Sequence, residues 1–394
     1  MKMAIFDINI SFCMIIILHM AKSTHASIYN KNNSGLTAVP SDIPGDTTQI
    51  FLSHNKITNI KENDFNTNNL TIVLHLEYNI ISNISVNAFS NLGKLTKLYL
   101  NNNNLTTLSS GVFDGLRNLA VLYLQMCAID FIENDALNIP TLTQLNLDNN
   151  NLRQFPNISR LVIISQLKIR YNMIEEIPDN GFTFNSPITV DLEKNKIKRT
   201  PALGNSCARL RHFTLTDSSL PELPVDMFKG CQELLSAQLA GNNLTSLLWV
   251  QYLSSKLFLL RIDHNKLTHM PSYLFANLTS LTTLTAAGNL LVQVDMALIQ
   301  FSSNFRILLI PDNSITSLDD PYRWCKGAAC SSLTINAIRN PLACDSRFCW
   351  DKYNTGIVFF RSDCFSKPWP NITPAELDCS GECQLPMKKT VKKS

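Results

Sequence analysis

Thirteen positions recur along this chain at a nearly constant interval, and this regularity is what most limits the fold. They are 22 to 24 residues apart until the last interval, which is 27. Apolar or small residues lie five and three positions before each, and Ile or Leu lies two positions after. A repeat of this length predicts a solenoid in which each turn packs against its neighbours. The positions are Asn55, Asn79, Asn103, Cys127, Asn150, Asn172, Asn195, Ser218, Asn242, Asn265, Asn289, Asn313 and Asn340.

The alternating apolar pair before each position, such as Leu98 and Leu100, predicts a short strand with both side chains pointing inward. Stacked turns would join these strands into one parallel sheet. The Asn side chain both donates and accepts hydrogen bonds, so we expect it to satisfy backbone groups of adjacent turns. Cys127 and Ser218 offer fewer hydrogen bonds, and we expect those two bends to be looser.

A second apolar column recurs ten residues after the Asn position and predicts packing beneath the convex wall. We interpret the Asn and Phe columns as structural, not as ligand-binding. The chain has 394 residues, 45% of them hydrophobic, which is enough for an extended core. A repeat array of this kind counts as one domain. The column contains Phe65, Phe89, Phe113, Phe182, Phe228 and Phe275.

The first 26 residues have the features of a secretory signal peptide. Lys2 precedes a mostly apolar run from Ile10 to Leu18, and small residues lead to Ala26. The run is too short for a comfortable membrane span, and an uncleaved anchor is the alternative. No later stretch reaches membrane length, so we expect a secreted, extracellular glycoprotein without a stable membrane span. Eight N-x-S/T sequons fit this route: Asn32, Asn69, Asn83, Asn104, Asn157, Asn243, Asn277 and Asn371.

Two cysteines lie at equivalent places on neighbouring turns. Cys207 and Cys231 each precede the recurring position of their own turn by eleven residues. Neighbouring strands lie about 4.8 Å apart, which is within the Cα range of a disulfide. This phase predicts a Cys207–Cys231 disulfide, and two buried thiols are the alternative. Cys127 is expected to be a free, buried thiol.

The repeat and the C-terminal cysteines together resemble extracellular leucine-rich repeat proteins, which include Slit, Toll-like receptors and variable lymphocyte receptors. The run from Asn340 to Trp350 begins N-P-x-x-C-D, as the C-terminal cap of that family does. The resemblance implies an α/β horseshoe with a concave parallel sheet, an irregular or short-helical convex side and a disulfide-bonded cap. It also implies the disulfides Cys344–Cys364 and Cys349–Cys379, although Ser346 stands where many members have a cysteine. Cys325 and Cys330 can pair locally, which leaves Cys383 without a partner.

The expected organisation has five parts. Residues 27–47 include the run Gly35-Leu36-Thr37-Ala38-Val39-Pro40, which resembles the end of the family's N-terminal cap but lacks its cysteines. We therefore expect this segment to fray. The parts are a signal peptide (1–26), a cap-like segment (27–47), about thirteen leucine-rich repeats (48–340), a C-terminal cysteine-rich cap (341–383) and a basic, disordered tail (384–394).

Charge and motifs argue against nucleic-acid binding and catalysis. The formal net charge is +3, but four lysines lie in the last seven residues; 34 basic residues less these four leave 30, against 31 acidic. A nucleic-acid partner would require a concentrated basic face. The sequence has no P-loop, H-E-x-x-H, G-x-S-x-G or dinucleotide fingerprint. We expect no enzymatic activity, no metal site and no cofactor.

Function is expected on the concave sheet, where the residues six, four and two before each recurring position point outward. Aromatic rings among mixed charges are typical of a protein-binding face. In the first and middle turns these residues are His75, Glu77, Lys97, Tyr99, Tyr123, Gln125, Gln144, Asn146, Asp148, Lys168, Arg170, Asp191 and Glu193. Later turns carry an apolar strip, for which we expect self-association as a homodimer, with ordinary surface as the alternative. The strip is Leu259, Ala287, Ile307, Leu309, Pro311 and Ile338.

Three functions fit these features. The first is a secreted recognition protein that binds a macromolecular partner, chiefly an extracellular protein, in adhesion, matrix organisation or guidance-type signalling. The second is a soluble innate-immune protein that recognises a microbial glycan or lipopeptide. The third is a self-associating structural matrix component. An apolar pocket between turns would favour the second function, whereas a flat, polar sheet would favour the first.

Overall fold

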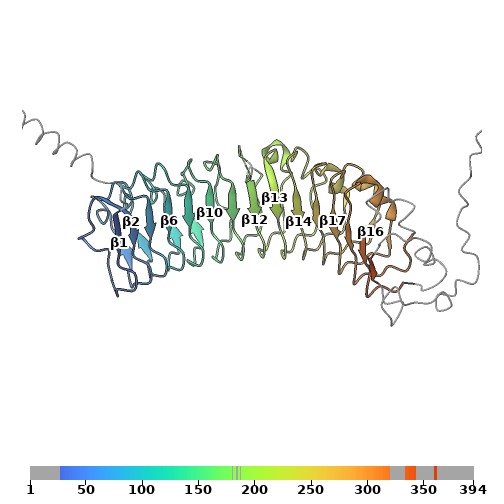
Figure 1. Cartoon of the computed structure of the whole chain (residues 1–394), viewed down its shortest axis with the longest axis horizontal. Coiled ribbons are helices and arrows are strands. Elements are labelled where there is room, and N and C mark those ends of the chain that lie inside the picture. The colour runs from blue at the N-terminus through green and yellow to red at the C-terminus, as the bar shows by residue number, and fades with distance from the viewer. Residues whose placement is uncertain are drawn as a thin grey trace, which may run out of the picture.

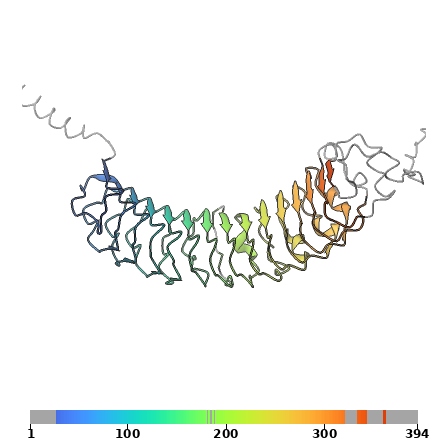
Figure 2. The same cartoon turned by 90° about the horizontal axis from the view of Figure 1, so that it is seen from below.

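A computed structural model of the chain describes residues 27–179, 181–182, 185–186, 188–319, 333–342 and 359–361. They form an elongated, curved solenoid (Figure 1). One parallel sheet of 15 strands runs along it, with the strands in sequence order from β1 to β21. Figure 2 shows these strands along the concave side of the arc, with loops and short helical segments on the convex side. The predicted horseshoe solenoid is confirmed.

Each of the thirteen predicted repeats contributes one strand to the long sheet. Most neighbouring strands pair residue for residue; Leu98, for example, lies opposite Leu122. The strands are β2 (Thr47–Phe51), β4 (Val73–His75), β6 (Lys97–Tyr99), β8 (Val121–Tyr123), β10 (Gln144–Asn146), β11 (Gln166–Lys168), β12 (Ile188–Asp191), β13 (Leu210–Thr214), β14 (Ser236–Gln238), β15 (Leu259–Arg261), β17 (Thr283–Thr285), β19 (Ile307–Leu309) and β20 (Thr334–Asn336). Strands β1 (Ser27–Asn30) and β21 (Phe359–Arg361) lie at the two ends.

The rest of each turn is compact. Short strands form three two-stranded sheets: β3 (Asn59–Ile60) with β5 (Asn83–Ile84), β7 (Thr107–Leu108) with β9 (Phe131–Ile132), and β16 (His269–Met270) with β18 (Gln293–Val294). Among the described residues of the second half, four short 3-10 helices are present: η1 (Gly204–Cys207), η2 (Leu248–Tyr252), η3 (Ser272–Phe275) and η4 (Met296–Phe301). The short helical segments that were expected on the convex side are therefore 3-10 helices in the described residues.

The predicted phenylalanine column is buried. Its six members are at most 4% exposed, and the rings of Phe65, Phe89 and Phe113 follow one another at centroid distances of 6.2 and 6.4 Å. Later ring contacts link Phe213 to Phe228 and Phe228 to Trp249. Burying one such side chain contributes about 1.5–3 kcal/mol, so this column is a main source of stability.

The recurring Asn side chains form the predicted hydrogen-bonded ladder. Asn79 Nδ2 donates to the carbonyls of Leu52, in the preceding turn, at 2.9 Å and of Leu76, in its own turn, at 3.0 Å. Its Oδ1 accepts the backbone N–H of Ile57 at 3.0 Å. The same three contacts recur at Asn103, Asn150, Asn172, Asn195, Asn242, Asn265, Asn289, Asn313 and Asn340.

The two non-Asn positions make weaker contacts. The Ser218 Oγ is buried without a hydrogen-bond partner. The Cys127 Sγ donates to the carbonyl of Leu100 at 3.2 Å. Burial raises the pKa of the Cys127 thiol to about 11, so this cysteine is an inert, buried thiol at neutral pH. Greater looseness at these two bends stays a prediction.

Replacing Ser218 by Asn is expected to raise the free energy of unfolding by about 1–2 kcal/mol, because an amide there gains ladder hydrogen bonds and removes an unpaired hydroxyl. Equilibrium unfolding in urea, followed by circular dichroism, measures the change. Ser219→Asn at the next, exposed position is the matched control and is expected to have little effect. An equal or lower stability for the Ser218→Asn protein would contradict the ladder interpretation.

The predicted disulfide between neighbouring turns is present. Cys207 and Cys231 are bonded, with their Cα atoms 4.8 Å apart. The other predicted pairings lie outside the described residues, as do the signal peptide, the basic tail and the sequon at Asn371. These cysteines are Cys325, Cys330, Cys344, Cys349, Cys364, Cys379 and Cys383.

The segment 27–47 extends the solenoid by another turn. Strand β1 pairs in parallel with β2, and the Asn55 Oδ1 accepts the backbone N–H groups of Ser34 and Leu36 at 2.9 and 3.0 Å. The cap-like segment of the sequence thus makes contacts like those of the repeats. Within the residues that the structure describes, no helix is long and apolar enough to cross a membrane.

Candidate binding surface on the concave sheet

The sheet register places the outward-facing residues in three columns along the concave side. The middle column contains the residue four positions before each recurring position. Its first members, Phe51, His75, Tyr99 and Tyr123, lie on the neighbouring strands β2, β4, β6 and β8 and are aligned by register. The next members are Asn146, Lys168 and Asp191.

We call the first four rings of this column the aromatic stack. Phe51 and His75 have centroids 4.6 Å apart, and His75 and Tyr99 are 4.4 Å apart, both pairs within 10° of parallel. Tyr123 meets Tyr99 edge to face at 5.3 Å and 84°. All four side chains are half-buried, since each ring covers its neighbour. Phe51 was absent from the sequence-based prediction, although it lies four residues before Asn55 and therefore belongs to the same outward-facing column.

Polar groups border the aromatic stack. The Glu77 Oε1 lies 3.0 Å from the His75 Nδ1, whereas the Glu77 Oε2 and the Gln125 Oε1 are buried without a hydrogen-bond partner. The Tyr123 hydroxyl donates to the Gln144 Oε1 at 3.4 Å. Burial raises the pKa of Tyr99, with smaller contributions from Tyr123 and Glu77. Lys97 is exposed in the column beside the rings.

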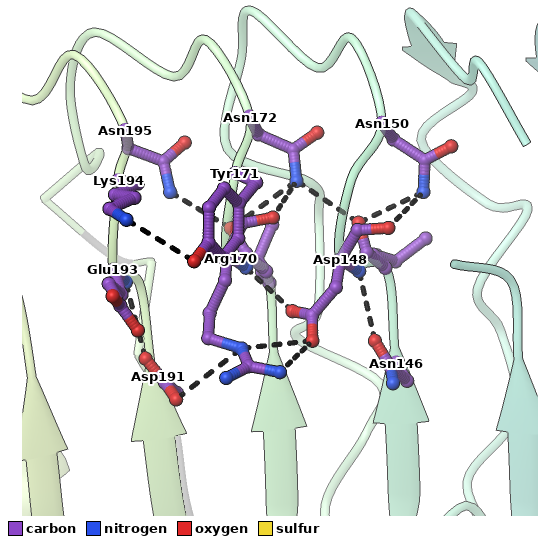
Figure 3. Close-up of polar contacts among 12 residues, drawn as sticks. Asn146, Asp148, Asn150, Arg170, Tyr171, Asn172, Asp191, Glu193, Lys194 and Asn195 are labelled. Atoms are coloured by element: carbon purple, nitrogen blue, oxygen red, sulfur yellow. Dashed lines mark hydrogen bonds and ion pairs between the residues drawn. The ribbon is translucent and has the colours of Figure 1, made fainter. Parts of the chain in front are cut away.

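A charged cluster follows the stack in the central turns (Figure 3). Arg170 donates from Nη2 and Nε to the Asp148 Oδ2, at 2.7 and 3.0 Å, and its Nε lies 3.7 Å from the Asp191 Oδ2. Asp148 is only 2% exposed. Arg170 was predicted to lie on the partner-binding face, and its guanidinium is paired with Asp148 within the chain. Replacing it would leave Asp148 buried without its counter-ion, so Arg170 also stabilises the fold.

Asp148 is primarily a structural residue. Its Oδ1 accepts the backbone N–H of Arg170 at 2.7 Å, which links two turns. Asp263, at the equivalent position of a later turn, does the same for the N–H of Ala287 at 2.8 Å. Burial raises the pKa of Asp191. Asp191 lies on the concave surface with Glu193 and Lys168. These three are charged groups of the central turns that a partner could contact.

A further column lies at the bend just before each recurring position. Its residues have positive φ, as at His54, Tyr78, Tyr171 and Lys194. His54 and Tyr78 stack at 4.4 Å and 6°, and the Lys194 ammonium lies 4.8 Å from the centre of the Tyr171 ring. Tyr78 is 48% exposed. The sequence-based prediction considered only the positions six, four and two before each recurring position and therefore missed these rings, which lie one position before it.

The apolar strip of the later turns is less continuous than predicted. Thr283 separates Leu259 from Ile307 in the sheet register, because β17 lies between β15 and β19. The compact apolar group is Ile307, Leu309 and Pro311, with Ala287 and Ile338 on either side, and all are half-buried. The prediction of one strip was wrong because residues of one column on adjacent turns differ in polarity. Self-association through these residues stays a prediction.

The predicted glycosylation sites avoid the concave columns. Of the seven in the described residues, Asn69, Asn83, Asn104, Asn157 and Asn277 are exposed, and Asn32 and Asn243 are half-buried. None lies six, four or two residues before a recurring position. Glycans at these sites would leave the concave columns free of attachment points, which is compatible with a binding surface there.

A pocket of about 580 Å³ lies away from the concave columns. Its lining includes two ion pairs, Lys198–Glu175 at 3.0 Å and Arg199–Glu176 at 3.5 Å. It is a charged pocket, unlike the apolar pocket that a lipopeptide would require. Among the described residues, no group of three or more His, Cys, Asp or Glu side chains has the arrangement of a metal site.

Comparison with known proteins agrees with this architecture. Residues 68–129 match the leucine rich repeat family model, and residues 202–326 match the model of a BspA type leucine rich repeat region. Fibromodulin of Oryctolagus cuniculus is 28% identical over 131 residues, which are 32% of this chain and 88% of the relative. Fibromodulin of Sus scrofa is 29% identical over 131 residues, with the same shares.

Solved structures show the same fold. A leucine-rich repeat protein of Leptospira interrogans superposes with a TM-score of 0.58 at 18% identity, covering 83% of this chain and 94% of the other. The leucine-rich repeat domain of APL1B superposes with a TM-score of 0.55 at 19% sequence identity. The match covers 84% of this chain and 86% of that domain. An internalin of Listeria monocytogenes superposes with a TM-score of 0.55 at 20% sequence identity. The match covers 74% of this chain and 80% of the internalin chain. The chain is a leucine-rich repeat protein.

Proposed function

We propose that this protein is an extracellular recognition protein that binds a protein partner on the N-terminal half of its concave face. The observation that carries the proposal is the aromatic stack of Phe51, His75, Tyr99 and Tyr123 on four neighbouring turns. Tyrosine is enriched among the residues that dominate binding energy at protein interfaces. Glu77 and Gln125 provide polar groups at the edge of the rings, as interface rims do.

The extracellular location is supported by three features. The sequence relatives are fibromodulins, which are extracellular matrix proteins. The Cys207–Cys231 disulfide favours an oxidising compartment. Five sequons are exposed in the described residues. Adhesion, matrix organisation and guidance-type signalling are the roles that we propose for such a protein.

Tyr99→Ala and Tyr123→Ala are each expected to weaken binding of the partner by about 1–3 kcal/mol, or roughly five- to 150-fold, because each removes a ring from the centre of the surface. The partner is first captured on the immobilised protein from extracellular fluid and identified by mass spectrometry. Its affinity for each variant is then measured by surface plasmon resonance.

Tyr273→Ala is the matched control, since Tyr273 is 66% exposed on η3, away from the concave strands. This variant is expected to bind as the wild type does. If the Tyr99→Ala, Tyr123→Ala double variant retained full affinity, the binding site would have to be placed elsewhere on the solenoid.

A structural matrix component that self-associates is the second candidate. The apolar group Ile307, Leu309 and Pro311 on one strand supports it, because apolar surface on an open sheet favours contact with another molecule. Recognition of a microbial glycan or lipopeptide is the third. The capture experiment separates the three, since it recovers a different protein, a second copy of this chain, or a non-protein ligand.

A further inference from the structure

We propose that the aromatic stack and its polar border bind an arginine side chain of the partner, within an extended segment that carries isolated basic residues. This inference rests on the proposed function and specifies the chemistry of the partner. Its basis is the pair of buried oxygen atoms without donors, the Glu77 Oε2 and the Gln125 Oε1, beside the rings.

The two oxygen atoms lie in one column. Glu77 and Gln125 each stand two residues before the recurring position of their turn, and a single turn separates them. Two strand spacings place them about 10 Å apart along the sheet. Buried acceptors are normally paired with protein or water. Four buried side-chain oxygen atoms of the described residues have no protein partner, and the two that lie in the concave columns are those of Glu77 and Gln125. At this separation one guanidinium meets only one of them, and we assign it to Glu77.

An arginine side chain matches this need better than other side chains do. The guanidinium has five N–H donors and no acceptor, and it pairs readily with a carboxylate. One Glu77 oxygen is engaged by His75, at 3.0 Å, which leaves the second oxygen for a donor from outside. Tyr99, which lies beside His75 on the next strand, offers its hydroxyl as a further acceptor in the neighbouring column.

The ring geometry argues against a neutral oligosaccharide. Phe51, His75 and Tyr99 cover one another's faces at 4.4–4.6 Å, within 10° of parallel. A sugar ring that stacked on this surface would need an open aromatic face, and these pairs leave mainly the ring edges. Donors that approach the acceptors beside the rings do not need an open face.

Acidic groups further along the sheet indicate a second basic position. Asp191 ends β12 and Glu193 lies two residues later, five strands beyond β4 in the sheet order. The Asp191 carboxylate is shared with Arg170, at 3.7 Å, so Glu193 is the acidic group that we assign to a second arginine. Five strand spacings are about 24 Å, a distance that an extended chain spans in about seven residues. Lys97 and Lys168 lie between these acidic positions on the concave side. Two separated arginines therefore fit this face better than a continuous basic run does.

Fluorescence anisotropy with three labelled peptides tests this inference. The probe has two arginines separated by a run of about six prolines, because polyproline is stiff and holds the two side chains about 22 Å apart. In the second peptide, citrulline replaces both arginines and keeps their shape without the charge. In the third, lysine replaces both. Wild type is expected to bind the arginine peptide at least tenfold more tightly than the citrulline peptide, and more tightly than the lysine peptide.

Glu77→Gln is expected to weaken binding of the arginine peptide fivefold or more. Glu222→Gln removes the same charge at an exposed position off the concave columns and is expected to change it less than twofold. Equal affinity for the arginine and citrulline peptides, or an unchanged Glu77→Gln variant of native melting temperature, would overturn the inference. So would Tyr99-dependent binding of chitohexaose together with no binding of the arginine peptide.

The captured partner separates failure of this inference from failure of the proposed function. If Tyr99→Ala abolishes partner binding and Glu77→Gln leaves it unchanged, the concave face is the binding site but arginine is not its ligand. If neither change affects the partner, the proposed function itself fails. Loss of partner binding in both variants, with Glu222→Gln unaffected, supports both.

Discussion

Asn172→Ala is expected to lower the free energy of unfolding by about 3–5 kcal/mol. The change removes the acceptor for the backbone N–H of Leu152, at 3.0 Å, and the donor to the carbonyls of Leu147 and Ile169, at 3.0 and 3.3 Å. Asn172 is 6% exposed, so water cannot easily replace these contacts. The Leu152 N–H is left buried without a partner, which costs about 1–3 kcal/mol. The carbonyls of Leu147 and Ile169 keep the amides of Asn150 and Asn195 as donors, so each loses one of two hydrogen bonds, at about 1 kcal/mol each.

Equilibrium unfolding in urea, followed by circular dichroism, measures this effect. Asn138→Ala is the control, because Asn138 is an exposed Asn outside the ladder. It is expected to change the stability by less than about 0.5 kcal/mol. Similar losses in the two variants would mean that the ladder amides contribute no more than a surface residue does.

Removing the Cys207–Cys231 disulfide is expected to cost about 3 kcal/mol, because the bond closes a loop with a sequence separation of 24 and restricts the unfolded chain. The Cys207→Ala, Cys231→Ala double variant and the reduced wild type are compared with the oxidised wild type in the same unfolding experiment. The double variant is expected to unfold at a lower urea concentration than the oxidised wild type. The reduced wild type is expected to unfold at the same or a lower concentration than the double variant, because reduction also opens the disulfides predicted among the C-terminal cysteines.

Peptide mapping without reductant provides an independent check. It is expected to recover a linked pair of peptides that contain Cys207 and Cys231. If a thiol reagent labelled both cysteines in denatured, unreduced protein, the bond would be absent and the stability prediction would lose its basis.

The sequence predicts the solenoid because each position within the repeat has a fixed place in the turn. Asn79, Leu74 and Leu76 recur with a fixed phase, and phase alone places them at the bend and inside the coil. The same phase predicted the contact between Cys207 and Cys231, which the structure contains. In a solenoid each residue meets its equivalents on neighbouring turns, so sequence spacing translates directly into spatial neighbourhood.

The binding surface is harder to predict because it depends on which side chains engage each other. Column positions place Asp148 beside Arg170, but they do not show that the carboxylate is buried and that the guanidinium is occupied. The unpaired oxygen of Glu77 follows from the orientation of His75, which spacing cannot give. His54 and Tyr78 were missed because they lie one residue before the recurring position, whereas the prediction used only the positions six, four and two before it.

The two exceptions in the ladder are expected to divide the solenoid into three mechanical segments. Ser218 and Cys127 are the joints, since each lacks the amide that fastens one turn to the next. The disulfide encloses Ser218 and reinforces that joint covalently, whereas Cys127 is a free thiol. Tyr99 and Tyr123 stand on either side of the Cys127 joint. A partner that contacts both rings would therefore bridge the bend that we expect to be looser and is expected to stiffen the array there.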